Sequence, residues 1–472
     1  MLNDKIAVIG AGCSGIAACQ ALQERSIPFD CFEKGSDVGG LWRYENDNAL
    51  ASAYSSLYIN TSRATARYAS HPMPDDYPDF PHHTQMLSYL EDYVERFGLR
   101  DRIRFRTEVT GVRRIDDAWE VRWREAEGAE RSGRYTAVLI ASGHHWDPRP
   151  LDPPLPGAFT GREIHSHSYR TAESFADESV LVVGIGDSAM DIACDTSRVS
   201  KMTFLTARRG AWIVPKYLGS VPLDQVAVKL QSRLPIAREV SSGALVNIGG
   251  ALFARQIDRI YGQPEDHGLP KPDHKFGAGV LTGSAEIFTR IGLGRVTPKP
   301  WPSRLDGERV RFQDGSIAHV DAIVYCTGYR ITLPFLSEHE QVVDAKDNSV
   351  PLYKRVVHPD RPGLYFIGLI DVAGPLNPLA EMQAQWVADL IEGHVELPSR
   401  SQMQQAIARE NRRRRKRFGG PGRNAIHVDY IPYLNALRRE RKRRRYGRRR
   451  SLPGTERSGE VRLSTQASRS QQ

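Results

Sequence analysis

The sequence predicts an α/β protein with two doubly wound parallel sheets, the second domain being inserted into the first. A strand–helix–strand pattern occurs near the N-terminus (5–34), a second one occurs in mid-chain (179–210), and hydrophobic strands that end at glycine lie beyond each. Parallel sheets require such crossover helices, and their buried strands are continuous apolar runs. The length of 472 residues, with 40% hydrophobic and 26% charged residues, is typical of a protein with several folded domains.

The first pattern begins with "KIAVIG" (5–10), which is apolar, β-branched and ends at glycine, so it predicts a buried strand. "AGCSGIAACQALQERS" then predicts a helix that opens on glycines, and "PFDCFEK" (28–34) predicts the next strand. A β-α-β unit of about 30 residues has the expected size. "YTAVLIASG" (135–143) adds a further hydrophobic strand with a glycine end.

The second pattern has the same construction. "SVLVVG" (179–184) predicts a strand, "IGDSAMDIACDTSRV" a helix and "MTFLTARRG" (202–210) another strand. Two more hydrophobic strands follow in "VDAIVYCTGY" (320–329) and "GLYFIGL" (363–369). Two such units in one chain indicate two doubly wound domains.

A helix from about Pro378 to Glu392 is expected to complete the first domain. We expect the chain to divide into the first part of domain one (1–158), a linker (159–169), the inserted domain two (170–320), the second part of domain one (321–400) and a tail (401–472).

The tail differs from the rest of the chain in charge. It carries 21 Lys and Arg against 5 Asp and Glu, a net charge of +16, so the remainder has a net charge of −7. Blocks such as "RRRRKR" (412–417) and "RRERKRRRYGRRR" (438–450) cannot bury enough apolar surface to fold alone. We expect a largely disordered basic tail, with a possible helix through 401–417 packed on the body.

The cysteines and the N-terminal sequence favour a cytoplasmic location. The five cysteines form neither a CxxC pair nor a zinc spacing, which fits a reduced setting. The start, "MLNDKIAVIG", does not resemble a signal peptide. The apolar segment "GALVNIGGALFA" (243–254) is too short to span a bilayer, and we expect neither a transmembrane segment nor a metal site.

The first unit contains a phosphate-binding turn. "GAGCSG" places Gly10, Gly12 and Gly15 in the GxGxxG spacing between a strand and a helix. These glycines allow a tight turn, close approach of a pyrophosphate and helix–strand packing, while the helix N-terminus favours the anion. Glu33 follows 18 residues after Gly15 at the end of the next strand, where an acid can bind ribose hydroxyls. This Rossmann-like cradle suits the adenosine of FAD.

The second unit contains a related turn, "GIGDSA", with Gly184, Gly186 and Ala189 at the motif positions. Its next strand ends not at an acid but at Arg208 and Arg209. Guanidinium groups suit a 2′-phosphate, which favours NADPH over NADH, although two solvated arginines would give the same pattern. Two cradles in one chain indicate two dinucleotides, with an NADPH domain inserted into an FAD domain.

Several segments resemble flavin-containing monooxygenases, a family of class B flavoprotein monooxygenases. They are "EKGSDVGGLW" (33–42), the segment 57–99 around Asn60, Thr61 and Ser62, and "CTGY" (326–329). The linker "FTGREIHSHSY" matches the family fingerprint FxGxxxHxxxY, in which Gly161 could adopt a positive φ. The resemblance covers roughly residues 5 to 395 and leaves the tail outside.

The resemblance implies that NADPH reduces FAD and that a flavin hydroperoxide then oxygenates a soft nucleophile, an amine nitrogen or a thioether sulfur. It implies Asn60 as the catalytic residue near the flavin. The cofactor-binding candidates from the motifs and the resemblance are Gly10, Gly12, Ser14, Gly15, Glu33, Lys34, Gly40, Leu41, Trp42, Asn60, Thr61, His165, Gly184, Gly186, Asp187, Ser188, Ala189, Arg208, Arg209 and Gln383. The helix that starts near Pro378 could direct its positive end at the flavin.

Two residues depart from the family pattern. Asp187 stands where the family usually has asparagine, and a carboxylate at a phosphate-binding turn should repel the cofactor unless it points away. Gln385 replaces a common arginine.

Three alternatives remain open on sequence grounds. A Baeyer–Villiger monooxygenase acting on ketones has a similar pattern but typically ends its fingerprint with tryptophan, whereas this chain has Tyr169. A disulfide reductase would need a redox cysteine pair. The basic tail could bind nucleic acid or a membrane surface, although specific nucleic-acid binding is not expected. The partners expected are a small-molecule substrate, O₂ and a possible second copy of the chain, and the substrate segment around 213–260 shows no specificity code.

Overall fold

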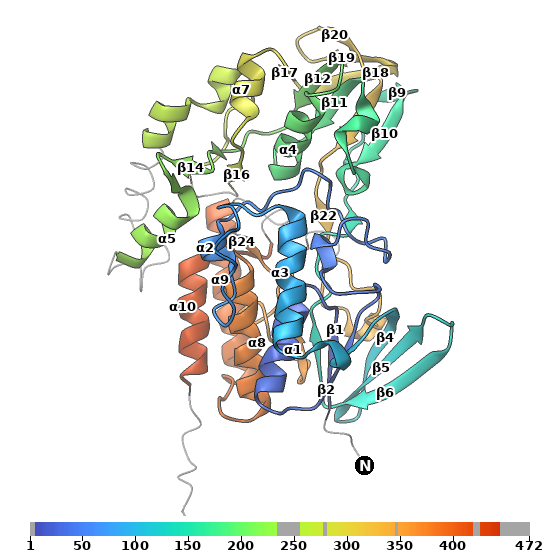
Figure 1. Cartoon of the computed structure of the whole chain (residues 1–472), viewed down its shortest axis with the longest axis vertical. Coiled ribbons are helices and arrows are strands. Elements are labelled where there is room, and N and C mark those ends of the chain that lie inside the picture. Colours follow the sequence, from blue (N-terminus) through green and yellow to red (C-terminus); the bar gives the residue numbers. More distant parts are fainter. Residues whose placement is uncertain (1–4, 234–254, 277–280, 345–347, 419–424, 444–472) are drawn as a thin grey trace, which may run out of the picture.

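The computed structural model describes residues 5–233, 255–276, 281–344, 348–418 and 425–443. Figure 1 shows two lobes, one built around a five-stranded parallel sheet that contains β1 and one around a second five-stranded parallel sheet that contains β11. The apolar segment 243–254, and with it residues 234–254 of the expected substrate segment 213–260, lie outside the described residues. The predicted fold class is confirmed.

The first sheet has the order β23-β7-β1-β2-β3, and all its pairs are parallel. Its strands are β1 (Ile6–Ile9), β2 (Phe29–Phe32), β3 (Ile103–Arg104), β7 (Ala137–Ile140) and β23 (Leu364–Phe366). The central strands β1 and β7 are buried on both faces, as their unbroken apolar runs predict.

The second sheet has the order β10-β21-β11-β12-β17 and is also parallel. Its strands are β10 (Arg162–His165), β11 (Ser179–Val183), β12 (Met202–Thr206), β17 (Val296–Lys299) and β21 (Ala322–Tyr325). The sheet therefore includes one strand from the expected linker 159–169 and one from the expected 321–400 segment. Both boundaries of the inserted domain lie outside the predicted 170–320, because its sheet recruits the connecting segments as strands.

Three helices pack against the first sheet and bury its apolar side chains. They are α1 (Cys13–Glu24), α3 (His83–Arg96) and α8 (Asn377–Ile391). One hydrophobic cluster joins residues of all three to the strands, so 377–391 completes the N-terminal domain although it is far away in sequence. In the other lobe α4 (Asp187–Thr196) and α7 (Ile287–Gly292) pack against the second sheet (Figure 1).

Smaller antiparallel sheets extend both lobes, and the sequence pattern did not predict them. The first comprises β4 (Thr107–Ile115), β5 (Ala118–Glu125) and β6 (Glu130–Tyr135). The second comprises β18 (Pro302–Gly307), β19 (Arg309–Phe312) and β20 (Ile317–His319), with β9 (Gly157–Phe159) alongside. Their strands carry many charged residues on the exposed face, which weakens the apolar signal.

The prediction of a largely disordered tail was wrong for residues 401–418 and 425–443. The possible helix through 401–417 is confirmed by α9 (Arg400–Phe418), and β25 (His427–Asp429) and α10 (Tyr430–Arg441) follow. Strand β25 pairs in parallel with β24 (Asp371–Ala373), directly before α8. The second charge block is tolerated in part because Arg441 pairs with Asp389 on the body at 2.7 Å.

No helix in the described part of the chain is long and apolar enough to cross a membrane.

Candidate active site

The turn after β1 is closed by backbone contacts that only glycine permits. Gly10 has a φ of +96°, and a Cβ on Gly15 would lie 1.8 Å from the carbonyl oxygen of Gly10. Gly12 is the N-cap of α1, has no side-chain cap, and no acid lies in the first turn of the helix. No acid in the first turn of α1 therefore competes for the N-terminal N–H groups of this helix, which fits a pyrophosphate.

Glu33 lies beside this turn and is 4% exposed. Its carboxylate accepts hydrogen bonds from the N–H of Ala11 and the N–H of Gly35, both at 2.7 Å. Asn48 donates to the same carboxylate. Each carboxylate oxygen can accept more than one hydrogen bond, so Glu33 braces the cradle and can still bind a ribose hydroxyl.

Three of the next four predicted cofactor-binding residues lie beside the cradle, and the fourth, Lys34, does not. Gly40, Leu41 and Trp42 form the short helix η1, and a Cβ on Gly40 would lie 3.0 Å from Cα of Gly12. Lys34 instead points to the surface, where it is 40% exposed and pairs with Glu108 at 2.9 Å.

The turn after β11 has the same arrangement as the turn after β1, except that Ala189 replaces the third glycine of the motif. Gly184 has a φ of +149°, and a Cβ there would lie 2.7 Å from the carbonyl oxygen of Cys326. Gly186 is the N-cap of α4 and has no side-chain cap, and Ser188 lies in the first turn of α4. Ala189 is fully buried. This turn also presents a helix N-terminus to an anion.

Asp187 opens α4, and its carboxylate is held by a hydrogen bond within the protein. Its Oδ1 accepts a hydrogen bond from the N–H of Gly283 at 2.8 Å. Burial raises the pKa of Asp187 to about 6, the Gly283 N–H opposes this rise, and the Asp191 charge adds to it. The Lys216 ammonium favours the charged carboxylate, while burial lowers the pKa of that lysine. The predicted repulsion is thus moderated by geometry and by a nearby cation.

Arg208 and Arg209 lie exposed just after β12. Arg208 donates to the carbonyl oxygen of Asp152 at 3.1 Å, and Arg209 pairs with Asp273 at 2.7 Å. Both guanidinium groups keep further N–H donors for a phosphate.

The Asn60 loop is fastened to the inserted domain. Asn60 is exposed and Thr61 is partly buried, directly before the buried Ser62. The backbone N–H and the hydroxyl of Ser62 both donate to Asp224, at 2.9 and 2.8 Å. Lys216 donates to the carbonyl oxygen of Ile59 at 3.4 Å. Asp224 and Lys216 were missed from the sequence because nothing in their local pattern marks a contact across the domains.

The fingerprint segment 159–169 requires glycine at position 161 for a different reason from the one expected. Gly161 is not among the glycines with positive φ, so the prediction of a left-handed turn was wrong. A Cβ there would instead lie 2.4 Å from the carbonyl oxygen of Asp321. Tyr169 is 1% exposed and donates its hydroxyl to Asp195 at 2.6 Å. Burial lowers the pKa of His165 to about 4, so this ring is neutral near pH 7, and its Nδ1 accepts from the N–H of His167.

Gln383 is completely buried in α8. Its Oε1 accepts from the N–H of Gly368 at 2.8 Å, and its Nε2 donates to the hydroxyl of Tyr433 at 2.7 Å. Both ends of the amide are therefore used within the protein, and direct contact with a cofactor stays a prediction.

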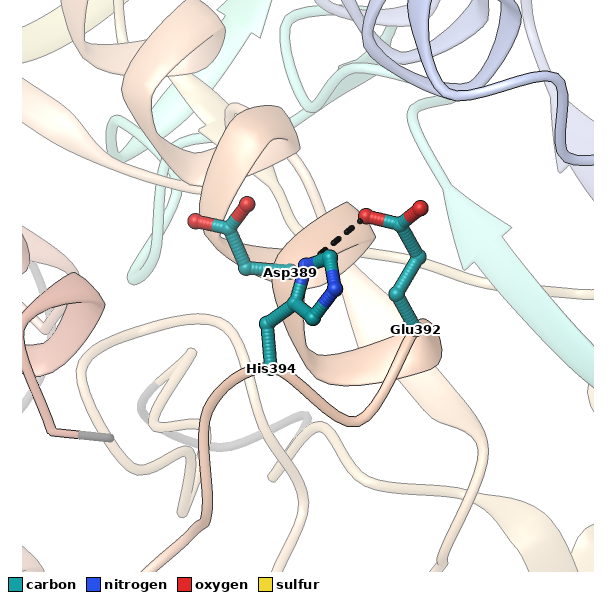
Figure 2. A group of neighbouring side chains, drawn as sticks. All are labelled: Asp389, Glu392 and His394. Atoms are coloured by element: carbon teal, nitrogen blue, oxygen red, sulfur yellow. Dashed lines mark ion pairs between the residues drawn. The ribbon is translucent and has the colours of Figure 1, made fainter. Parts of the chain in front are cut away.

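One acidic cluster has the composition of a metal site. Figure 2 shows Asp389, Glu392 and His394 at the end of α8, with an ion pair between His394 and Glu392. Asp389, however, pairs with both Arg25 and Arg441 at 2.7 Å, and Arg25 also reaches Glu392 at 3.3 Å. Two guanidinium groups already neutralise the carboxylates, so the cluster fastens α1, α8 and α10 together. The expectation of no metal site stays a prediction.

Residues 3–442 match the family described as flavin-binding monooxygenase-like. The chain belongs to this family. Flavin-containing monooxygenase 5 of Oryctolagus cuniculus is 36% identical over 455 residues, covering 93% of this chain and 82% of that protein. Dimethylaniline monooxygenase (N-oxide-forming) 2 of Rattus norvegicus is 33% identical over 447 residues, covering 92% and 82%.

The structure of S-allyl-L-cysteine S-oxygenase from Allium sativum shares the fold, with a TM-score of 0.68, 24% identity and coverage of 93% and 88%. The resemblance seen in the sequence is thereby confirmed, and it extends through α10 rather than ending near 395. This flavin monooxygenase is an oxidoreductase that uses FAD and NADPH, as the two cradles predicted. Membership of the family also excludes the disulfide reductase alternative.

Proposed function

We propose that this flavin monooxygenase oxygenates a soft nucleophile, an amine nitrogen or a thioether sulfur, with FAD in the first cradle and NADPH in the second. The observation that carries the proposal is the 33% identity to a relative named for N-oxide formation. The S-oxygenase of Allium sativum supports it only through a common fold. Tyr169 at the end of the fingerprint supports it as well, since the ketone-oxidising alternative typically has tryptophan there.

Different residues bind the two nucleotides. The N-terminus of α1 and Glu33 bind the pyrophosphate and the ribose of FAD, while α4 and the arginines 208 and 209 bind NADPH. When bound, FAD supplies the redox and oxygen-transfer chemistry. The N-terminus of α8 has no acid in its first turn, so its positive end can stabilise negative charge on the isoalloxazine ring.

Asn60 is proposed to orient its amide toward the reacting atoms between the nucleotides. The amide can donate and accept hydrogen bonds without changing its charge. The contacts of Ser62 and Lys216 hold the loop on which it lies, so its position is set by both domains.

The test uses the purified protein reconstituted with FAD. NADPH oxidation is measured with a tertiary amine, a thioether and a cyclic ketone, and the products are identified by mass spectrometry. An N-oxide or sulfoxide formed in proportion to NADPH consumed supports the proposal. A lactone from the ketone, with no amine or thioether product, would establish the Baeyer–Villiger alternative. Asn60→Ala should retain FAD but release most reducing equivalents as H₂O₂, whereas the neighbouring exposed Tyr58→Phe should not.

The expected cytoplasmic location and the possible homodimer stay predictions. Fractionation of cells that produce the protein tests the location, and light scattering of the purified protein tests the homodimer.

A further inference from the structure

Tyr433 is the last side chain in a directed series of hydrogen bonds that begins next to the first cradle. The N–H of Gly368 donates to Oε1 of Gln383, Nε2 of Gln383 donates to the hydroxyl of Tyr433, and that hydroxyl donates to the carbonyl oxygen of Lys354 at 2.6 Å. Because a backbone N–H can only donate, Gly368 fixes which side of the Gln383 amide is oxygen. The amide nitrogen then requires an acceptor, which Tyr433 supplies.

Gly368 touches the cradle itself. It follows β23, has a φ of +76°, and a Cβ on it would lie 2.0 Å from Oγ of Ser14. Ser14 is buried in the first turn of α1, the turn that presents its N–H groups to the pyrophosphate. A shift of Gly368 by a few tenths of an ångström would therefore move the start of α1 or open a gap beside it.

We propose that Tyr433, on the C-terminal helix α10, is a positioning residue for the flavin, acting through Gln383 and Gly368 on the first turn of α1. It contributes no atom to the cofactor site. The inference rests on the proposed placement of FAD in the first cradle.

The other contacts of α10 make this role separable from docking of the helix. Glu440 accepts from the hydroxyl of Tyr353 at 2.7 Å. Arg441 pairs with Asp389 and donates to Gln385 at 2.6 Å. Strand β25, just before α10, pairs with β24. Because these contacts hold the helix at its other end and before its start, loss of one hydroxyl should leave it docked.

Tyr433→Phe tests the proposal, with Tyr430→Phe as the matched control. Tyr430 lies one turn earlier on α10, and its hydroxyl makes no hydrogen bond with the described residues. We expect Tyr433→Phe to weaken FAD binding to the apoprotein by about tenfold, the effect of leaving one buried amide without its partner. The visible absorption bands of the bound flavin should shift in this variant alone. Equal FAD affinity in wild type and Tyr433→Phe would overturn the proposal, even if the variant melts earlier.

A double-mutant cycle separates the relay from general packing. If Tyr433 acts through Gln383, then Tyr433→Phe should weaken FAD binding no further in a chain that already carries Gln383→Leu. Fully additive losses would show that Tyr433 acts by another route and would overturn the proposal. Should Gln383→Leu not fold, Gln383→Met takes its place. A wild-type protein that binds no FAD would refute the proposed function instead, which keeps the two failures distinct.

Discussion

The two cradles use one backbone motif but differ in what surrounds it. In the first, Gly15 contacts Gly10 so closely that no side chain fits, while in the second the corresponding Ala189 is accommodated. The first turn of α1 has no acid, and that of α4 begins with Asp187. Glu33 is buried beside the first turn, whereas the arginines 208 and 209 lie exposed near the second. These differences suit a nucleotide that stays bound and one that exchanges in every cycle.

The largest expected effect comes from adding a methyl group to the first cradle, compared with removing one from the second. Gly15→Ala puts a Cβ 1.8 Å from a backbone oxygen, so the turn must open. We expect a loss of about 3 kcal/mol or more in the free energy of unfolding and a preparation without bound FAD. Ala189→Gly in the second cradle should cost about 1 kcal/mol and keep the flavin. Flavin absorbance per chain and thermal unfolding measure both, and a yellow Gly15→Ala protein would contradict the comparison.

A smaller effect is expected at the arginines. Replacing both Arg208 and Arg209 with alanine removes the guanidinium groups proposed to bind a 2′-phosphate, so the Michaelis constant for NADPH should rise roughly tenfold to a hundredfold. The constant for NADH, which lacks that phosphate, should stay within about twofold. Lys201→Ala, at the opposite end of β12, removes a charge without touching the cradle and serves as the control. An equal loss for both nucleotides would show that the arginines act structurally.

The smallest effect is a pH dependence at Asp187. Because the pKa of its carboxyl is raised to about 6, the group is largely neutral below pH 5 and charged above pH 7. NADP⁺ should therefore bind roughly three- to tenfold more tightly to Asp187→Asn than to wild type at pH 7.5, and equally at pH 5. The ratio of the two dissociation constants cancels the titration of the ligand. Calorimetry at several pH values measures it, and a ratio that is independent of pH would show that Asp187 does not face the phosphate.

The strands and turns that were predicted correctly from the sequence have a local physical cause. β1 and β11 are buried along their whole length, so each is a continuous apolar run in the sequence, and each leads into a glycine-rich turn. The strand at 322–325 was expected in the first domain but belongs to the second sheet, because an apolar run does not show which strand it pairs with. Asp224, Lys216 and Tyr433 contact residues 50 or more positions away in sequence, and no local spacing encodes such contacts. The folded tail escaped prediction because its charges are neutralised by distant partners.

The position of β25 has a consequence for synthesis of the protein on the ribosome. The inserted domain closes its sheet once residue 325 has emerged, since all five of its strands precede that point. The other domain must wait for β23, α8 and finally the strand and helix at 427–441. A nascent chain should therefore carry a finished nicotinamide module beside an unfinished partner, and acquire its yellow colour only after residue 441 has been synthesised.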